Sequence, residues 1–171
     1  LVICIGMALP QVANVFAATV EDIALLKSPG REKILVEGAK KEGKVTFYTG
    51  LTVDQVVRPL KEAFEKDYPF VQLEFFRGNS ERVAQKMLLE YQAKRFDVDV
   101  LSGSGSTTMI QQAGFMQRFY SPQLAEYPNE LKDPKGFWAS SNVYFMTAAY
   151  NTRNVRAADV PKSYDDLLHP R

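Results

Sequence analysis

Residues 44–57, KVTFYTGLTVDQVV, decide the fold. Val45 and Phe47 alternate with less apolar residues, which is the period of a strand buried on one face. Hydroxyl and glycine residues interrupt this pattern at 49–52, and apolar residues then recur at helical spacing over 53–64. A strand, a short loop and a helix in this order form the first half of a parallel βαβ unit.

The same order recurs twice further along the chain. A strand predicted over 70–76 leads into a helix that Asn79 or Ser80 caps, and a strand predicted over 96–101 leads into a short helix that Gly114 ends. Three such units predict an α/β fold, with a mostly parallel sheet and flanking helices.

Helical and apolar segments frame these units. Short helices are predicted over 19–27 and 31–41, and Gly43 ends the second of them. A long apolar strand is expected over 137–150, and residues 160–167 open another helix.

The helix after the first strand carries two local signals. Thr52 and Gln55 have the spacing of a capping box, so Thr52 is expected to cap the helix. Pro59 lies inside the helical pattern, which predicts a kink or a late helix start.

Composition excludes several function classes. The 171 residues hold 21 Lys and Arg against 20 Asp and Glu, a net charge of +1 that argues against nucleic-acid binding. One His and one Cys nearly exclude a His/Cys zinc site and make His-based nucleophilic catalysis hard to build. Asp97 and Asp99 share a strand face before its carboxyl end, so we expect them to cap or pair locally.

The first residues predict export. Residues 1–9 are apolar and uncharged, too short to span a bilayer, and small residues follow up to Ala18. This pattern favours a signal peptide over 1–17 whose basic start is missing. Cleavage would remove Cys4, the only cysteine, which suits an oxidising compartment.

Candidate ligand-binding residues lie where the strands end. In an open α/β sheet, ligands bind beyond the carboxyl ends of the strands, where the loops 49–52, 77–80 and 102–107 would meet. Hydroxyls, glycines and the amides of helix N-termini suit a carboxylate or another oxyanion. Each hydroxyl alone is better explained as a helix cap, so the prediction depends on convergence. The candidates are Thr49, Gly50, Leu51, Thr52, Arg77, Ser102, Gly103, Ser104, Gly105, Ser140 and Ser141, with Tyr48 and Tyr150 as weaker candidates for the cleft.

Several segments together resemble bacterial extracellular solute-binding proteins of ABC importers, and most of all the iron(III)-type branch. They are EGAKKEGKVTFYTG at 37–50, FRGNSERV at 76–83, DVDV at 97–100, AAYNT at 148–152 and VPKSYDDL at 160–167. The resemblance implies a two-lobed fold of the periplasmic-binding-protein type II-like class that closes on its ligand like a clamshell.

The resemblance also implies a domain organisation. Residues 1–17 would be the signal peptide, 18–43 a helical N-terminal segment, and 44–155 the N-terminal α/β lobe, ending in a crossover strand. Residues 156–171 would begin the C-terminal lobe, whose remainder would lie beyond Arg171. The hinge is expected near 151–155.

The ligand stays open between two classes. Family members that hold iron(III) commonly use a His in the first loop and an acidic residue in the third, where this chain has Thr52 and Ser104. Iron(III) prefers anionic oxygen or imidazole ligands. Neutral hydroxyls and amides fit a small oxyanion or organic acid better, and no metal ligand or cofactor is assigned.

The resemblance implies a non-enzymatic periplasmic protein, monomeric when complete. It would capture a small-molecule or metal-ion solute for an inner-membrane ABC permease and its ATPase, and it would bind no nucleic acid. One alternative is an exported α/β enzyme using the loop 102–106, although the only His is His169. A solute sensor subunit is another alternative.

Overall fold

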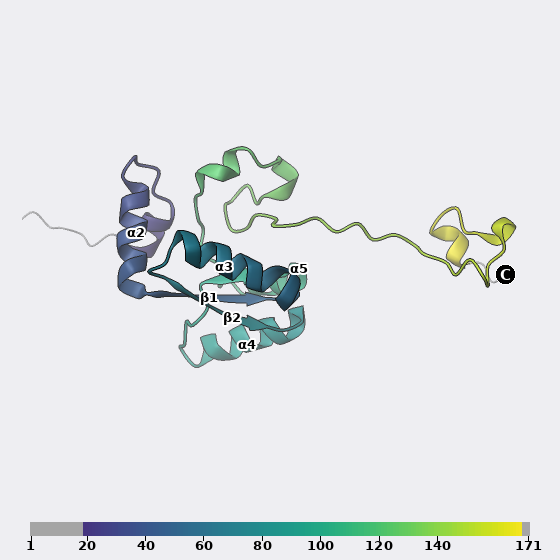
Figure 1. Cartoon of the computed structure of the whole chain (residues 1–171), viewed down its shortest axis with the longest axis horizontal. Coiled ribbons are helices and arrows are strands. Elements are labelled where there is room, and N and C mark those ends of the chain that lie inside the picture. The colour runs from purple at the N-terminus through teal and green to yellow at the C-terminus, as the bar shows by residue number, and fades with distance from the viewer. Residues whose placement is uncertain (1–18, 169–171) are drawn as a thin grey trace, which may run out of the picture. The chain divides into compact units, whose positions relative to one another are not determined.

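The computed structural model describes residues 19–168 (Figure 1). The predicted signal peptide, residues 1–17, and His169 lie outside this range. The chain divides into two compact units, one ending at Ala139 and the other beginning at Ser140. Among the described residues, no helix is both long and apolar enough to cross a membrane.

Two helices precede the sheet, as predicted: α1 (Val20–Ala24) and α2 (Arg31–Glu42). Thr19 caps α1 in a capping box with Asp22, so the side chain of each accepts from the backbone amide of the other. Gly43 ends α2 in the left-handed conformation, with a φ of 71°, which glycine adopts without a steric penalty.

The sheet of the first unit has three parallel strands in the order β2-β1-β3. Their bounds are β1 (Lys44–Thr49), β2 (Gln72–Arg77) and β3 (Val100–Ser102). The chain leaves β1 toward one edge and then crosses to the other, so the strand order reverses around β1. β3 is shorter than the predicted strand, because only the last three residues of β1 pair with it.

The helices that join the strands lie on both faces of the sheet. Figure 1 shows α3 (Arg58–Asp67) and α4 (Ser80–Gln92) on opposite sides of it. The core under α3 is built from Phe47, Val57 and Leu73, and Phe64 packs against them. α5 (Ser104–Gln112) follows β3 and packs beside α4.

The start of α3 confirms one local prediction and corrects another. Regular helix begins only at Arg58, with Pro59 in its first turn, after a short π-helix (η1, Val53–Val57). The carbonyl of Thr52 accepts from the amides of Val56 and Val57, both at 3.2 Å. Pro59 has no amide hydrogen to donate to the preceding turn of a helix. The wider π-helical turn η1 comes directly before this proline. The Thr52 side chain caps nothing, so the predicted capping box with Gln55 is wrong.

Residues 115–139 are irregular and are tied to the N-terminal helices. The Tyr120 amide donates to the Ala24 carbonyl at 2.9 Å, and the Arg31 guanidinium donates to the Tyr120 carbonyl at 2.6 Å. Arg118 forms an ion pair with Glu21. These contacts fix the helical N-terminal segment to the lobe.

The second unit differs from its prediction. Residues 140–150 form no strand, and Phe145 and Met146 are 91% and 92% exposed. Strand structure needs a paired neighbour, and within the described residues the sheet ends at β3. The helix predicted over 160–167 is replaced by two 3₁₀ turns, Ala157–Asp159 and Asp165–Leu168.

Candidate functional site

The three loops of the predicted site meet at the carboxyl edge of the sheet. Thr49 is paired in register with Arg77 on one side and with Ser102 on the other. The Gly50 amide donates to the Ser102 carbonyl at 3.2 Å, and the Gly78 amide donates to the Thr49 carbonyl at 3.0 Å. The convergence on which the sequence prediction depends is therefore present.

Glycine is required where α5 begins. Gly103 has a φ of 155°, and a Cβ at this position would lie 2.7 Å from the Ser106 hydroxyl. Ser106 is fully buried and donates to the Gly103 carbonyl at 3.1 Å. A Cβ on Gly105 would lie 3.1 Å from the Cβ of Ser80. The two glycines thus let the first turn of α5 approach the first turn of α4.

Two helix N-termini are brought together in this way. Asn79 caps α4 by accepting from the Arg82 amide at 2.9 Å, whereas α5 has no side-chain cap. Ser104 and Gly105, in the first turn of α5, are exposed to solvent, and so is Arg77 at the end of β2. Free amides, a positive helix end and a guanidinium suit an anionic ligand. Within residues 19–168, no group of three or more His, Cys, Asp and Glu is arranged to hold a metal ion.

The predicted residues differ in what their side chains do. Thr49 is fully buried, and its hydroxyl accepts from the Leu51 amide at 3.1 Å, so it shapes the first loop. Leu51 packs against the core, which leaves Gly50 and Thr52 exposed in that loop.

The remaining candidates lie elsewhere. Ser102 is half-buried, and Ser140 and Ser141 belong to the second unit. The Ser141 hydroxyl donates to the Asn142 side chain at 3.0 Å. As ligand-binding residues, all eleven remain predictions.

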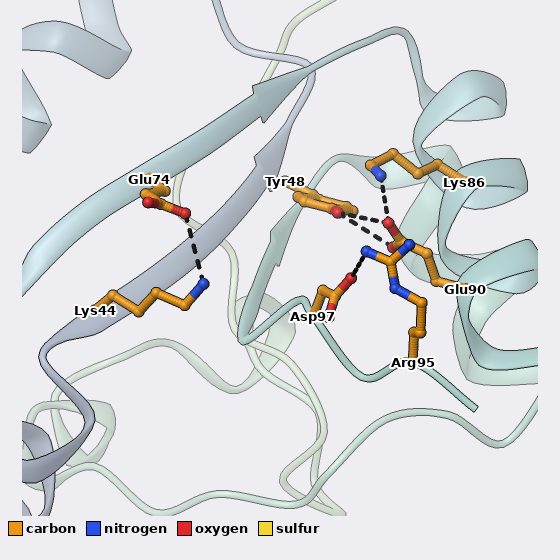
Figure 2. Close-up of polar contacts among 7 residues, drawn as sticks. All are labelled: Lys44, Tyr48, Glu74, Lys86, Glu90, Arg95 and Asp97. Carbon is orange, nitrogen blue, oxygen red and sulfur yellow. Dashed lines mark hydrogen bonds and ion pairs between the residues drawn. The ribbon is translucent and has the colours of Figure 1, made fainter. Parts of the chain in front are cut away.

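Tyr48 belongs to a buried polar network rather than to the loops. Its hydroxyl contacts both carboxylate oxygens of Glu90, at 3.0 and 3.1 Å, and Glu90 also pairs with Lys86 (Figure 2). The Lys86 ammonium lies over the rings of Tyr48 and Phe76. Burial raises the pKa of Tyr48, and the hydrogen bond to Glu90 raises the pKa of Lys86. The interpretation of Tyr48 as a cleft residue is therefore wrong.

This network holds α4 against β1. Tyr48 is the residue before Thr49 on β1, and α4 begins at Ser80 beside the α5 loop. The only sequence signal for the network is the spacing of Lys86 and Glu90, four residues apart on a helix. The spacing does not reveal the tyrosine that they contact.

Asp97 pairs locally, as predicted, whereas Asp99 contacts β1 instead of a residue near it in the sequence. Asp99 accepts from the Thr46 amide at 2.8 Å, and Asp97 forms an ion pair with Arg95 (Figure 2). The contact between Asp99 and Thr46 joins the chain to β1 one residue before β3 begins to pair with that strand. Neither carboxylate is therefore assigned a ligand role.

The comparisons with known proteins agree with this fold. Residues 96–171 match the family model of bacterial extracellular solute-binding proteins. The resemblance to that family is confirmed. Iron-bound HitA from Pseudomonas aeruginosa is 24% identical, with a TM-score of 0.57, over 72% of this chain and 40% of that one. A Trichodesmium protein (IdiA, FutA) in complex with iron and citrate is 20% identical, with a TM-score of 0.49, over 57% of this chain and 30% of that one.

The likeness to HitA shows the fold: a mixed α/β lobe of the periplasmic-binding-protein type, with a parallel sheet and flanking helices. The chain spans less than half the length of either solved protein. The matched family is one of binding proteins rather than enzymes. No curated protein matches the chain.

Proposed function

We propose that this chain supplies the N-terminal lobe of a periplasmic solute-binding protein that delivers a small solute to an ABC permease and its ATPase. The family match over residues 96–171 and the fold support the proposal. The observation that carries it is the junction of three loops at the carboxyl edge of β2, β1 and β3. Ligands of open α/β sheets bind at this place, where the strand order reverses.

The chemistry of the loops favours an anionic solute. The exposed first turn of α5 offers backbone amides, and Arg77 offers a guanidinium at the end of β2, on the other side of β1. An oxyanion or organic acid would accept hydrogen bonds from both. Iron(III) is the other candidate, and its anionic ligands would have to come from outside the loops 49–52 and 102–106, which hold no acidic residue or His.

The remaining features of the proposal follow the family's working cycle. A second lobe would complete the cleft, and the two lobes would close by a hinge near residues 151–155, stabilised by contacts made only in the closed state. Ser140 and Ser141 would line the cleft from the segment before that hinge. Export would depend on the signal peptide over 1–17.

Calorimetric titration with named anions tests the proposal. Citrate, inorganic phosphate, methylphosphonate and iron(III) chloride would each be titrated into the full chain. We expect one of the anions to bind, and Arg77→Ala to weaken its binding by about tenfold, since a charge-assisted hydrogen bond contributes about 1.5–3 kcal/mol.

Arg95→Ala is the matched control, because Arg95 is also exposed and pairs with Asp97 before β3, at the ends of the strands opposite the loops. Its affinity should equal that of the parent chain. Equal weakening by both variants would indicate general charge attraction and contradict a site at these loops. Binding of iron(III) without a response to any anion would contradict the assignment of an anionic solute.

A further inference from the structure

β2 is the edge strand of the sheet on the side away from β3. The amides of Gln72 and Gly78 donate toward β1, to the carbonyls of Gly43 and Thr49. Peptide groups of alternate residues in a strand point to opposite sides, so those of Leu73 point away from β1, toward the open edge. An open edge of this kind is a template for pairing with another strand.

Two side chains of α3 occupy that edge at Leu73. Glu65 accepts from the Leu73 amide at 2.8 Å, and Lys61 donates to the Leu73 carbonyl at 2.7 Å. Lys61 and Glu65 also form an ion pair with each other, and both are partly buried, with 28% and 31% of the side chain exposed. The pair thus presents to β2 one acceptor and one donor, as the backbone of a neighbouring strand would.

We propose that Lys61 and Glu65 form an edge cap that prevents β2 from pairing with a strand of a second copy of this chain. The geometry supports this role because both polar groups of one peptide position are satisfied by one helix. A solvent-exposed ion pair elsewhere on α3 would do nothing for the edge. This protection of the edge against strand pairing is separate from any contribution that the ion pair makes to the stability of the monomer.

The same chain contains a suitable donor strand. Residues 143–150, VYFMTAAY, are exposed, unpaired and rich in residues that favour strands. Phe145 and Met146 are almost completely exposed. In a second copy, this segment is the occupant that we assign to an uncapped edge of β2, since it combines apolar side chains with a backbone that lies in no β-ladder.

Removing the cap in the full chain tests the proposal. We expect the double variant Lys61→Ala/Glu65→Ala to self-associate in sedimentation velocity, with a dimer dissociation constant roughly tenfold or more below that of the parent. Hydrogen exchange at the Leu73 amide should also become roughly tenfold faster in dilute, monomeric samples. The double variant Glu62→Ala/Lys66→Ala removes the same charges from exposed positions of α3 and should resemble the parent.

Two further variants separate the cap from general instability and identify the donor. Val83→Ala removes buried volume from α4, which lies on the opposite side of the sheet from Lys61 and Glu65 on α3 (Figure 1). Association of the two variants is compared at urea concentrations that unfold the same fraction of each. Under these conditions Val83→Ala should associate less than the uncapped variant. Equal association of the two variants, or an uncapped variant that stays monomeric, overturns the proposal. Adding Phe145→Lys to the uncapped variant should restore the monomer. Unchanged association would overturn the assignment of residues 143–150 as the donor.

Discussion

β1 and residues 143–150 have similar compositions and opposite environments. β1, KVTFYT, buries Phe47 and Tyr48 to 6% and 4% exposure, whereas VYFMTAAY leaves Phe145 91% exposed. The difference lies in the neighbours: β1 has a paired strand on each side and a helix on each face. Strand propensity measures how well a side chain fits a pleated, half-buried surface, so it predicts a strand only where that surface exists.

Truncating one phenylalanine from each segment gives the largest expected contrast. Phe47→Ala should lower the free energy of unfolding by about 3–5 kcal/mol, because it removes a buried ring from the core under α3. Phe145→Ala should change it by less than about 0.5 kcal/mol, since the ring is exposed. Urea denaturation of the full chain measures both.

If Phe47→Ala and Phe145→Ala lose comparable stability, the contrast between a buried β1 and an exposed segment 143–150 is contradicted. It would mean that residues 143–150 are packed in solution, in a strand or against another copy. Repeating the denaturation at several protein concentrations separates these outcomes, because only association makes the midpoint depend on concentration.

Gly103→Ala tests the stability of the first unit at the loops instead of in the core. The new Cβ would lie 2.7 Å from the hydroxyl of buried Ser106, at a φ of 155° that side chains rarely adopt. We expect a loss of about 2–3 kcal/mol, from backbone strain and overpacking together. Gly30→Ala is the control, because a Cβ there meets no atom within 4 Å. A neutral Gly103→Ala would show that the α5 turn relaxes freely.

The sequence predicted the features that depend on nearby residues. The strand at 44–49, the glycine that ends α2 and the cap of α4 at Asn79 each depend on residues a few positions apart, and all three are present. The alternation predicted burial of one face only, but β1 is buried on both faces from Thr46 to Thr49. The loops 49–52, 77–80 and 102–107 were placed at one edge because parallel strands end together. Their junction through Gly50, Gly78 and Ser102 follows from that topology.

The sequence did not predict features that depend on distant partners. The sequence offers Tyr48 only as a weaker candidate for the cleft, but the acceptor of its hydroxyl is Glu90, 42 residues further on. The edge contacts of Lys61 and Glu65 with Leu73 likewise join a helix to a strand that follows it. The prediction of a strand over 137–150 was wrong, because the composition of a segment does not show whether a neighbouring strand is available to pair with it.

The last prediction concerns the other face of β1, where packing is polar. Tyr48→Phe should lower the free energy of unfolding at neutral pH by about 1–2 kcal/mol, because it removes a hydrogen bond to a buried carboxylate. Burial raises the pKa of Tyr48 above its ordinary value of 10.0, and Glu90 raises the pKa of Lys86 above 10.5. Both groups bind protons more tightly when folded, so their contribution is complete below pH 10 and is lost as the pH rises through the folded values.

The parent should therefore lose stability steeply above pH 10, and Tyr48→Phe should lose less over the same interval. Denaturation midpoints at several pH values from neutral to strongly alkaline measure the two slopes. Tyr68→Phe removes an exposed hydroxyl and should keep the slope of the parent. If Tyr48→Phe keeps that slope as well, the Tyr48 hydroxyl ionises as freely in the folded chain as in the unfolded one. The contact with Glu90 would then be too weak to hold α4 on β1, and the position of the α4 N-terminus beside Gly105 would have to depend on the apolar packing of Val83 and Ala84.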